Sequence, residues 1–487
     1  MALGRIFIGV ELGRILRRSK KRCPLKQRGL GRSLSLRDVA IESLEDRCLL
    51  AAGAPYTPPA NDPLYNEEWN LNNTGQVGGT PGADVNVLPA WQEGYTGKGV
   101  TVGVVDSGVY YNHPDLAANY NASLSYNYFN NSPDAEPPLG PLLEPFATGA
   151  QAGEDSHGTE VAGIIAGNGA NGAGSVGVAP NATIASERIV TFDPSGNLVQ
   201  GGYPQEYDAL TAHNQQIDVY NNSWGYIPQQ FAAAPGDPQP GGIFSSDSLT
   251  TQNGVSAMQQ GDLGITPTGA QVLAGRDGLG NIYVFAAGNS NFSSELAQLF
   301  GPTYAQYAIG NTNDEAETAS RFADVVAALG PAGQQAVYSD PGASILVSAP
   351  GGYDGAGAPD ENGIPSSSVL AVPDSTAPSG LAYEATYDDN GTFGMNGTSA
   401  ATPGVSGVVA LMLQANPNLS WRDVQEILAE SATKNDPTDL GWTGNGFGCT
   451  SDGAIVTVDS SGNYDGSTPL PAGVTVSGRV LRSNNST

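Results

Sequence analysis

An aspartate, a histidine and a serine stand in settings that suit nucleophilic catalysis. His157, one of three histidines in the chain, opens the segment His-Gly-Thr-Glu-Val-Ala-Gly. Asp106 ends an apolar run, and Ser399 lies in a Gly-Thr-Ser turn that leads into a helical pattern. A serine hydroxyl attacks a carbonyl when an imidazole takes its proton and a carboxylate orients that imidazole. Together the three residues therefore predict an acyl-transfer site.

Each of these residues also has a structural interpretation. A lone histidine is more often structural than catalytic, an aspartate at a strand end commonly caps a turn, and a serine before a helix is a usual N-cap. A fourth residue shifts the balance toward chemistry. Asn289 follows an apolar run in Ala-Ala-Gly-Asn, and its side-chain amide can stabilise a developing oxyanion. Helix N-terminal amides beside Ser399 would add to that stabilisation.

The segments that must position these residues alternate between strand and helix patterns. Short apolar runs predict strands buried on both faces of a sheet, at 101–105, 218–223, 281–287 and 344–349. Helical stretches lie at 158–166, 399–415 and 421–432. The alternation predicts an α/β fold with a mostly parallel central sheet and helices on both faces. Because parallel strands end at one edge of the sheet, Asp106 and His157 would meet there.

Local signals refine the helices and the loops. We expect Pro403 in the first turn of its helix, where a missing N–H does no harm. Ser420, with Asp423 three residues later, resembles a capping box. His213 falls in a polar helical stretch. Stretches rich in Pro, Gly, Ser and Asp predict long surface loops at 130–155, 226–272 and 351–392.

Five motifs carry a resemblance to a known family. The segments VVDSG, HGTEVAG, NNSWG, AAGN and GTSAATPGVSGVVALML resemble those of the subtilisin-like serine peptidases. The longer segments NDPLYNEEWNL and GRDGLGNIYVFAAGN are similar to the kexin or proprotein-convertase branch. The resemblance implies a subtilisin-like three-layer fold. It also implies that Asp106 orients His157, that His157 acts as base and then acid, and that Ser399 is the nucleophile.

The resemblance further implies an oxyanion hole and a substrate-binding strand. Asn289 and the Ser399 amide match the oxyanion hole, and Gly288 precedes that asparagine. The substrate-binding edge matches Ser223, Trp224 and Gly225. A polypeptide substrate would add to this edge through backbone hydrogen bonds. An ordinary buried strand is the alternative interpretation of the same three residues.

A structural calcium ion is the cofactor that the resemblance implies. Hard oxygen ligands from carboxylate, amide and carbonyl groups suit this ion. The matching positions are Asp62, Asp115 and Asn171, with the carbonyls of Asn168, Ala173 and Ser175. Taken alone, the Gly-rich loop that holds the last four is an unremarkable turn, and it lacks the Lys of a phosphate-binding loop. Glu295 and Asp340 match part of a second calcium site, in which Pro228 replaces a carboxylate.

The specificity pocket departs from the convertase pattern. Enzymes of that branch bind basic substrate residues in a pocket with acidic walls. In this sequence Pro228 and Phe300 fall where carboxylates are expected. Cleavage after paired basic residues is therefore not indicated. A preference for apolar or aromatic residues is an equally open prediction.

Charge distribution excludes two classes of partner. Twelve of the 20 Lys and Arg residues lie in the first 50 positions, which leaves eight against 43 Asp and Glu in the rest. A body this acidic repels phosphate backbones and anionic lipids, so we expect no nucleic-acid partner. No run of about 18 apolar residues exists, so we also expect no membrane span.

Composition changes from basic to acidic near Gly53. Residues 1–52 resemble a bacterial export leader that ends in Leu-Glu-Asp-Arg-Cys-Leu-Leu, with a disordered basic tail as the alternative. We expect residues 53–450 to form the catalytic domain and 451–487 a polar tail, either disordered or a truncated module. The protein would then be secreted or held at the cell surface, as a monomer.

The competing hypothesis is a catalytically inactive binding protein that keeps the subtilase fold. It is favoured by the lack of any segment between 53 and 62 that could hold a prodomain, and by the polar residues that replace the closing helix of the family after Gly448. Two other hydrolase classes are excluded by their motifs. An α/β-hydrolase esterase needs Gly-x-Ser-x-Gly and a zinc peptidase needs His-Glu-x-x-His, and neither is present.

Overall fold

The computed structural model describes most of the chain between residues 54 and 433, and short strands beyond it. The described ranges are 54–56, 62, 64–137, 156–169, 171–172, 174–192, 198–200, 203–225, 249–289, 291, 311–352, 363–367, 394–433 and, within 442–484, five strands. Contacts divide the chain near its end, so that Gly53–Pro437 belongs to a larger compact unit and Thr438–Thr487 to a smaller one.

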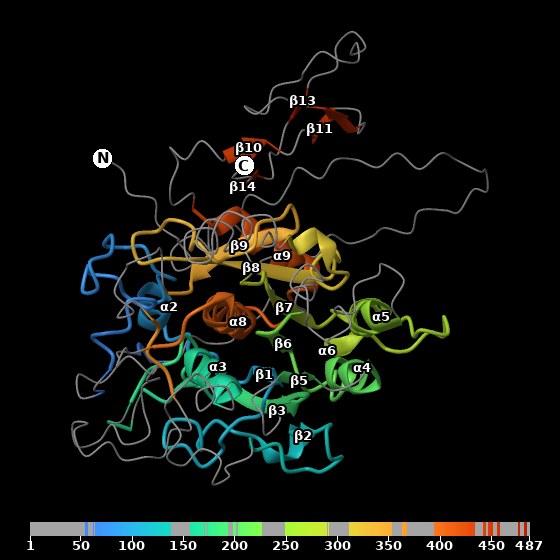
Figure 1. The fold of residues 1–487 in the computed structure, drawn as a ribbon, viewed down its shortest axis with the longest axis horizontal. Coiled ribbons are helices and arrows are strands. Elements are labelled where there is room, and N and C mark those ends of the chain that lie inside the picture. The colour runs from blue at the N-terminus through green and yellow to red at the C-terminus, as the bar shows by residue number, and fades with distance from the viewer. Residues whose placement is uncertain are drawn as a thin grey trace, which may run out of the picture. The chain divides into compact units, whose positions relative to one another are not determined.

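A seven-stranded sheet forms the centre of the larger unit (Figure 1). In spatial order its strands are β2 (Tyr126–Asn127), β3 (Thr183–Arg188), β1 (Thr101–Asp106), β6 (Val219–Asn222), β7 (Ile282–Ala286), β8 (Ala323–Leu329) and β9 (Ile345–Pro350). Every neighbouring pair runs parallel. This confirms the predicted α/β class with a mostly parallel sheet.

Strand order reverses at β1, which lies between β3 on one side and β6 on the other. Such a reversal opens a crevice outside the carboxyl ends of the strands, because the connections leave in opposite directions. The pairing registers Asp106 with Arg188 on β3 and Val104 with Asn221 on β6. The ends of β1 and β6 therefore lie side by side at the edge where a site is expected.

Helices cover both faces of the sheet (Figure 1). Helices α3 (His157–Ala166) and α8 (Thr398–Ala415) pack together on one face, and α4 (Tyr203–Thr211) and α5 (Leu249–Leu263) on the other. Side chains of β6 alternate between the faces, as strand geometry requires. Asn221 contacts α8 through Ser406, whereas the Tyr220 hydroxyl donates to the carbonyl of Ala212 just after α4.

Shorter helices complete the larger unit. They are α2 (Leu88–Gln92) and α6 (Gly275–Gly278), with 3-10 turns at Ala122–Leu124 and Thr312–Asp314. Helix α9 (Trp421–Ser431) has 11 residues, about as many as α3. Helix α9 begins with the predicted capping box, since the Ser420 hydroxyl accepts from the Asp423 amide while the Asp423 carboxylate accepts from Ser420. The amide of Trp421 then donates to the Leu279 carbonyl at 3.0 Å, which ties the start of α9 to the turn before β7.

The predicted strands at 101–105, 218–223, 281–287 and 344–349 and the three predicted helices are present, and their ends differ from the predictions by at most one residue. Three other predictions were wrong. The expected loop 226–272 contains α5. Its many Thr, Gln, Asn and Ser residues obscure the helical pattern in the sequence, although Ala257 and Met258 are buried. Pro403 is the sixth residue of α8 rather than a member of its first turn. His213 follows α4 in a left-handed conformation, with φ of 51°.

Strands β3 and β8 were not predicted at all. Charged residues interrupt their apolar patterns, namely Glu187 and Arg188 in β3 and Asp324 in β8. All three side chains are nevertheless buried. Burial raises the pKa of Glu187 well above its usual value and that of Asp324 to about 7, which favours their neutral forms in the core. A hydrophobic pattern does not mark such residues as buried.

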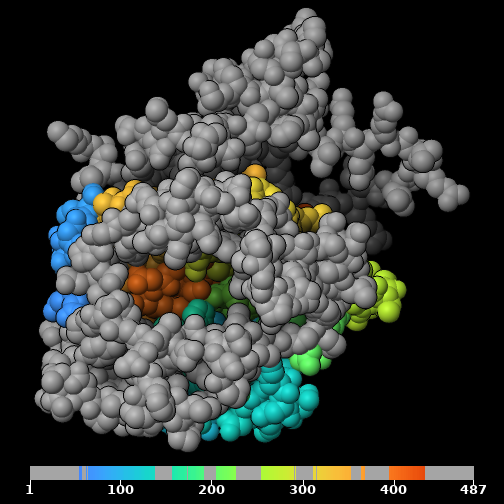
Figure 2. All heavy atoms as spheres, viewed as in Figure 1, coloured from blue at the N-terminus to red at the C-terminus, as the bar shows by residue number. Residues whose placement is uncertain are grey.

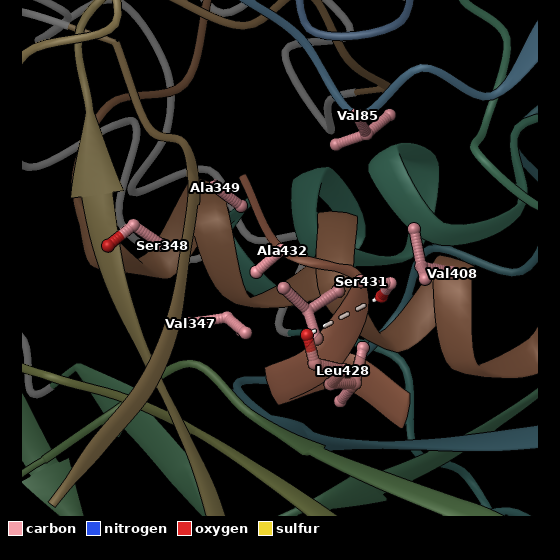
Figure 3. A pocket seen from close by; sticks show the side chains of 9 residues that line it. Val85, Val347, Ser348, Ala349, Val408, Leu428, Ser431 and Ala432 are labelled. Atoms are coloured by element: carbon pink, nitrogen blue, oxygen red, sulfur yellow. Dashed lines mark hydrogen bonds between the residues drawn. The ribbon is translucent and has the colours of Figure 1, made fainter. Parts of the chain in front are cut away.

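A small apolar pocket lies between α8, α9 and β9 (Figure 3). Val347 and Ala349 of β9, Val408 of α8 and Leu428 of α9 face it. Its full lining is Val85, Val347, Ser348, Ala349, Val405, Val408, Leu428, Ser431 and Ala432. None of these residues belongs to the predicted site, and several of them, such as Val347 and Ser348, are only half-buried.

Short antiparallel strands make up the described part of the smaller unit. Strand β10 (Trp442–Gly444) pairs with β14 (Arg482–Asn484), and β11 (Phe447–Thr450) pairs with β12 (Ile455–Thr457) and β13 (Val476–Ser477). A hairpin of β4 (Val190–Phe192) and β5 (Leu198–Gln200) follows β3 in the larger unit. The domain limits at 52 and 450 stay predictions. Among the described residues, no helix combines the length and apolar character needed to cross a membrane.

Candidate active site

Asp106 and His157 form a close pair at the carboxyl end of β1. The Asp106 side chain is 2% exposed, and its Oδ1 lies 2.8 Å from His157 Nδ1. Oδ1 also accepts from the Ser107 amide at 2.7 Å. Because a carboxylate only accepts, Nδ1 carries the proton in this contact and Nε2 of a neutral imidazole is left as a base.

A glycine lets the first turn of α3 approach β1 closely enough for this pair. The amide of Gly158 donates to Ser107 Oγ at 3.1 Å. A Cβ at position 158 would collide with the Gly108 carbonyl and lie 3.1 Å from the Asp106 Cβ. Any side chain here would therefore push His157 away from its carboxylate.

Ser399 is the second residue of α8. The N-cap of this helix is Gly397, so Ser399 does not have the capping role that was its alternative interpretation. Ser399 Oγ donates to the Ser223 carbonyl at 2.9 Å, which places the hydroxyl beside the end of β6. In Figure 2, orange atoms of the α8 segment meet green atoms of the segment around β6 on the face shown.

The turn before Ser399 is held by a tyrosine that the sequence did not single out. Gly397 has φ of 104°, a conformation that favours glycine. Its amide donates to the Gly351 carbonyl at 2.9 Å and to the Tyr338 hydroxyl at 3.1 Å. The Tyr338 hydroxyl in turn donates to the same Gly351 carbonyl at 2.6 Å. The end of β9 and the start of α8 are thereby tied together.

Asn289 is joined to the same turn through Thr398. Asn289 Oδ1 accepts from the Thr398 amide and from Thr398 Oγ1, each at 2.8 Å. Gly288 donates its amide to Thr398 Oγ1 at 3.2 Å. These bonds orient the Asn289 amide and leave Nδ2 as its donor end. Thr398 is the middle residue of the Gly-Thr-Ser motif, which was a signal that sequence analysis could have used.

The predicted substrate edge directly follows β6. Ser223 contacts Ser399, Trp224 is 9% exposed and packs edge-on against Phe285, and Gly225 is exposed. A carboxylate that sequence analysis missed lies over this edge. A Cβ built on Gly225 would be 3.6 Å from Glu315 Oε2. Pro228, Glu295 and Phe300 lie outside the described residues.

Two buried glutamates lie behind Glu315. Glu317 and Glu206 are 2% and 1% exposed, and a Cβ at Gly254 of α5 would collide with both carboxylates. Burial, and then the charge of Glu206, raises the pKa of Glu317 to about 9. The Glu206–Glu317 pair therefore favours keeping a proton at neutral pH.

The residues predicted to bind calcium lie close together, apart from Ala173, which is outside the described residues. Asp62 and Asp115 are 2% and 0% exposed. Asp115 accepts from Asn171 Nδ2 at 2.6 Å and from the Ser175 amide at 3.1 Å, and its carbonyl accepts from the Asn168 amide at 3.0 Å. Asp62 accepts from the Gly172 amide at 3.1 Å. The loop therefore wraps around two buried carboxylates.

This arrangement fits a hard cation. Asp62 Oδ2 is buried without a hydrogen-bond partner, and burial raises the pKa of Asp62 to about 6. A cation would compensate that oxygen. Among the described residues no group of three or more His, Cys, Asp and Glu could hold a metal, so amide and carbonyl oxygens must complete the shell. Oxygen donors of this kind suit calcium better than zinc.

Comparison with known proteins agrees with this geometry. The model of the subtilase family matches residues 97–448. The chain belongs to the subtilase family. Its sequence is 31% identical to neuroendocrine convertase 2 of Mus musculus over 390 residues, which are 80% of this subtilase and 49% of the relative. It thus spans about half the length of the curated relatives it matches, and the resemblance to the convertase branch is confirmed.

Solved structures support the fold of this subtilase. The serine protease of Aeromonas sobria has a TM-score of 0.56 at 26% identity, over 88% of this chain and 65% of that one. A protease from Pseudoalteromonas arctica has a TM-score of 0.50 at 26% identity, over 77% of this chain and 92% of that one. The predicted subtilisin-like three-layer fold is therefore confirmed.

Proposed function

We propose that this subtilase is a serine endopeptidase that hydrolyses peptide bonds through an acyl-enzyme. The observation that carries the proposal is the 2.8 Å contact of Asp106 Oδ1 with His157 Nδ1, at the sheet edge where Ser399 is the second residue of α8. Membership of the subtilase family and the names of its solved neighbours, which are serine proteases, support it.

In this mechanism the Ser399 hydroxyl turns away from the Ser223 carbonyl, to which it donates at 2.9 Å. His157 Nε2 then takes its proton as Ser399 Oγ attacks the peptide carbonyl. Asp106 stabilises the imidazolium that forms, since its buried carboxylate faces Nδ1. Asn289 Nδ2 and the Ser399 amide would stabilise the oxyanion. His157 then protonates the leaving amine, and afterwards activates the water that hydrolyses the acyl-enzyme.

The substrate in this proposal is a polypeptide bound as an added strand along Ser223, Trp224 and Gly225. Gly225 is exposed and carries no side chain, so its backbone can pair with a peptide. The acidic composition argues against a nucleic-acid partner. We further propose that the protein acts as a monomer and is exported, secreted or held at the cell surface, which rests on the leader pattern of residues 1–52.

Calcium has a structural place in this proposal. Asp62, Asp115 and Asn171 would hold the ion, together with carbonyl oxygens of Asn168, Ala173 and Ser175. When bound, the ion would supply a fixed positive charge that compensates the buried carboxylates of Asp62 and Asp115. The residues themselves order the 168–175 loop against the segment around Asp115, whose carbonyl accepts from the Asn168 amide at 3.0 Å.

The decisive experiment is labelling by a serine-directed fluorophosphonate, combined with casein hydrolysis. We expect the wild type to label and to hydrolyse casein, and Ser399→Ala to do neither. Ser125→Ala is the matched control, because Ser125 is also buried and hydrogen-bonded but lies beside β2. A folded wild type that neither labels nor hydrolyses casein would support the inactive binding protein instead.

A further inference from the structure

Pro403 breaks the hydrogen-bond ladder of α8 at the nucleophile. In a helix, the amide of each residue donates to the carbonyl four positions earlier. Pro403 has no amide hydrogen, and its ring crowds the carbonyl of Ser399. The residue that bears the proposed nucleophile therefore has a carbonyl oxygen without its usual helical donor.

Ser223 supplies the donor that Pro403 cannot. Ser223 Oγ donates to the Ser399 carbonyl at 3.0 Å, and Ser399 Oγ donates to the Ser223 carbonyl at 2.9 Å. The two serines are thus joined by a reciprocal pair of bonds, one to the side chain and one to the backbone of each. This pair connects the first turn of α8 to the end of β6.

Two further buried groups fix the direction of these bonds. Asn221 Nδ2 donates to Ser223 Oγ at 2.9 Å, and Ser406 Oγ donates to Asn221 Oδ1 at 2.7 Å. Asn221 and Ser406 are 0% exposed and Ser223 is 1% exposed. A carbonyl only accepts, so Ser223 must donate to Ser399, Asn221 must donate to Ser223, and Ser406 must donate to Asn221. The hydrogen bonds therefore all run in one direction, from Ser406 of α8 to the carbonyl of Ser399 in the same helix.

We propose that Asn221, Ser223 and Ser406 are positioning residues that hold the carbonyl of Ser399 in place of the helical bond lost at Pro403. This inference rests on the proposed function. Holding that carbonyl fixes the backbone of residue 399, and with it the direction of both Ser399 Oγ and the Ser399 amide. A helical bond from residue 403 would hold the same carbonyl along the helix axis instead of toward β6.

The test measures reactivity of the nucleophile separately from substrate binding. We expect Ser223→Ala and Ser406→Ala to lower kcat and the rate of fluorophosphonate labelling about fivefold to tenfold, with KM within about twofold of wild type. Ser125→Ala is the control, since Ser125 Oγ also donates to a carbonyl, that of Asn121, and accepts from an amide, that of Ser186, each at 2.9 Å. Ser125→Ala should change neither kcat nor the rate of fluorophosphonate labelling.

A double-mutant cycle with Pro403→Ala distinguishes positioning from general stability. The alanine amide can donate to the Ser399 carbonyl, so Ser223→Ala should cost less than about twofold in kcat in that background. An equal loss in both backgrounds would overturn the proposal. So would variants that lower the melting temperature as Ser125→Ala does while leaving kcat and labelling unchanged.

Amide hydrogen exchange gives a readout that does not depend on activity. Loss of Ser406 Oγ should speed exchange of the amides at residues 399–402 at least about fivefold relative to wild type. Unchanged exchange in both Ser406→Ala and Ser223→Ala would overturn the proposal even if the wild type proved inactive. Failure of the wild type to label would overturn the proposed function alone.

Discussion

Asp106 accepts hydrogen bonds from two kinds of donor, and this decides which nitrogen of His157 can act as a base. Oδ1 receives both the Ser107 amide and His157 Nδ1. The first bond holds the carboxylate at the end of β1, and the second holds the imidazole. His157 is 31% exposed, so its other nitrogen can reach a substrate while its partner stays buried. The carboxylate at the end of β1 therefore both orients the His157 imidazole and supplies the negative charge that stabilises its protonated form.

Asn289 is predicted to stabilise the transition state by its Nδ2 hydrogen bond. Asn289→Ala should lower kcat about 10²- to 10³-fold with little change in KM, because the oxyanion forms only during reaction. Steady-state kinetics on a peptide substrate measures this. Thr398→Val is the matched control, since it removes the Thr398 Oγ1 bond to Asn289 but keeps the amide. A rate in Asn289→Ala no lower than in Thr398→Val would remove Asn289 from the mechanism.

Glu315 is predicted to favour a basic side chain in the part of the substrate that lies beside Gly225. Its carboxylate lies over Gly225, at the edge where a substrate would pair. Glu315→Gln should lower the ratio of kcat/KM for arginine over phenylalanine substrates about tenfold, because an attractive charge is removed. Paired fluorogenic peptides give this ratio. An unchanged ratio would leave the apolar preference as the better interpretation.

At the scale of elements, the site depends on how closely α3 and α8 approach the strand ends. Gly158 permits this for α3, because a side chain there would meet the Gly108 carbonyl after β1. Gly407 permits close packing of α8 on Val178 and on α3, whose Ile165 carbonyl would lie 3.5 Å from a Cβ at position 407. Helix α8 also contacts β6, β7, β8 and β9. The helix as a whole is thus packed against most of the sheet.

Gly158→Ala is predicted to damage both stability and activity. The new methyl group must displace the Gly108 carbonyl or the start of α3, at a cost of about 1–3 kcal/mol. His157 would shift from Asp106, so kcat should fall by more than the loss of folded protein explains. Thermal unfolding and single-turnover kinetics separate the two effects. Gly404→Ala is the control, because a Cβ there meets only Val85, at 3.8 Å.

At the scale of the whole molecule, the proposed calcium site joins segments far apart in sequence. Asp62 and Asp115 both accept bonds from the loop 171–175. We expect EDTA to lower the melting temperature, since a ligand at a hundredfold its Kd stabilises by about 2.7 kcal/mol. Asp115→Asn should abolish this response, whereas Asp277→Asn, at an exposed position, should keep it. A melting temperature indifferent to EDTA and calcium would contradict the assignment.

Stability should also fall as pH rises, because of Glu317. Burial, with the neighbouring Glu206 and Glu315, raises the pKa of Glu317 to about 9. A raised pKa means that the folded state keeps a proton which the unfolded state loses, so this stabilisation is complete below pH 4.5 and is lost as pH approaches 9. Glu317→Gln should flatten the fall in melting temperature from pH 5 to 9, and the exposed Glu93→Gln should not. Parallel slopes for all three proteins would contradict this.

Sequence alone determined the α/β class, most of the central strands and the segments that carry Asp106, His157, Ser399 and Asn289. These features are local, since an apolar run or a glycine turn before a helix can be seen within about ten residues. It failed for β3 and α5, where buried charges and a polar helix face depend on what packs against them.

Only the tertiary structure decided which distant groups support the site. Three contacts show this, each between residues that are 59 to 185 positions apart in the sequence. They join Tyr338 to Gly397, Glu315 to Gly225, and Ser406 to Asn221. No local pattern marks a tyrosine or a serine for such contacts. They arise because parallel strands bring remote segments to one edge of the sheet. Polar groups buried at that edge need hydrogen-bond partners, and the nearest ones come from segments distant in sequence.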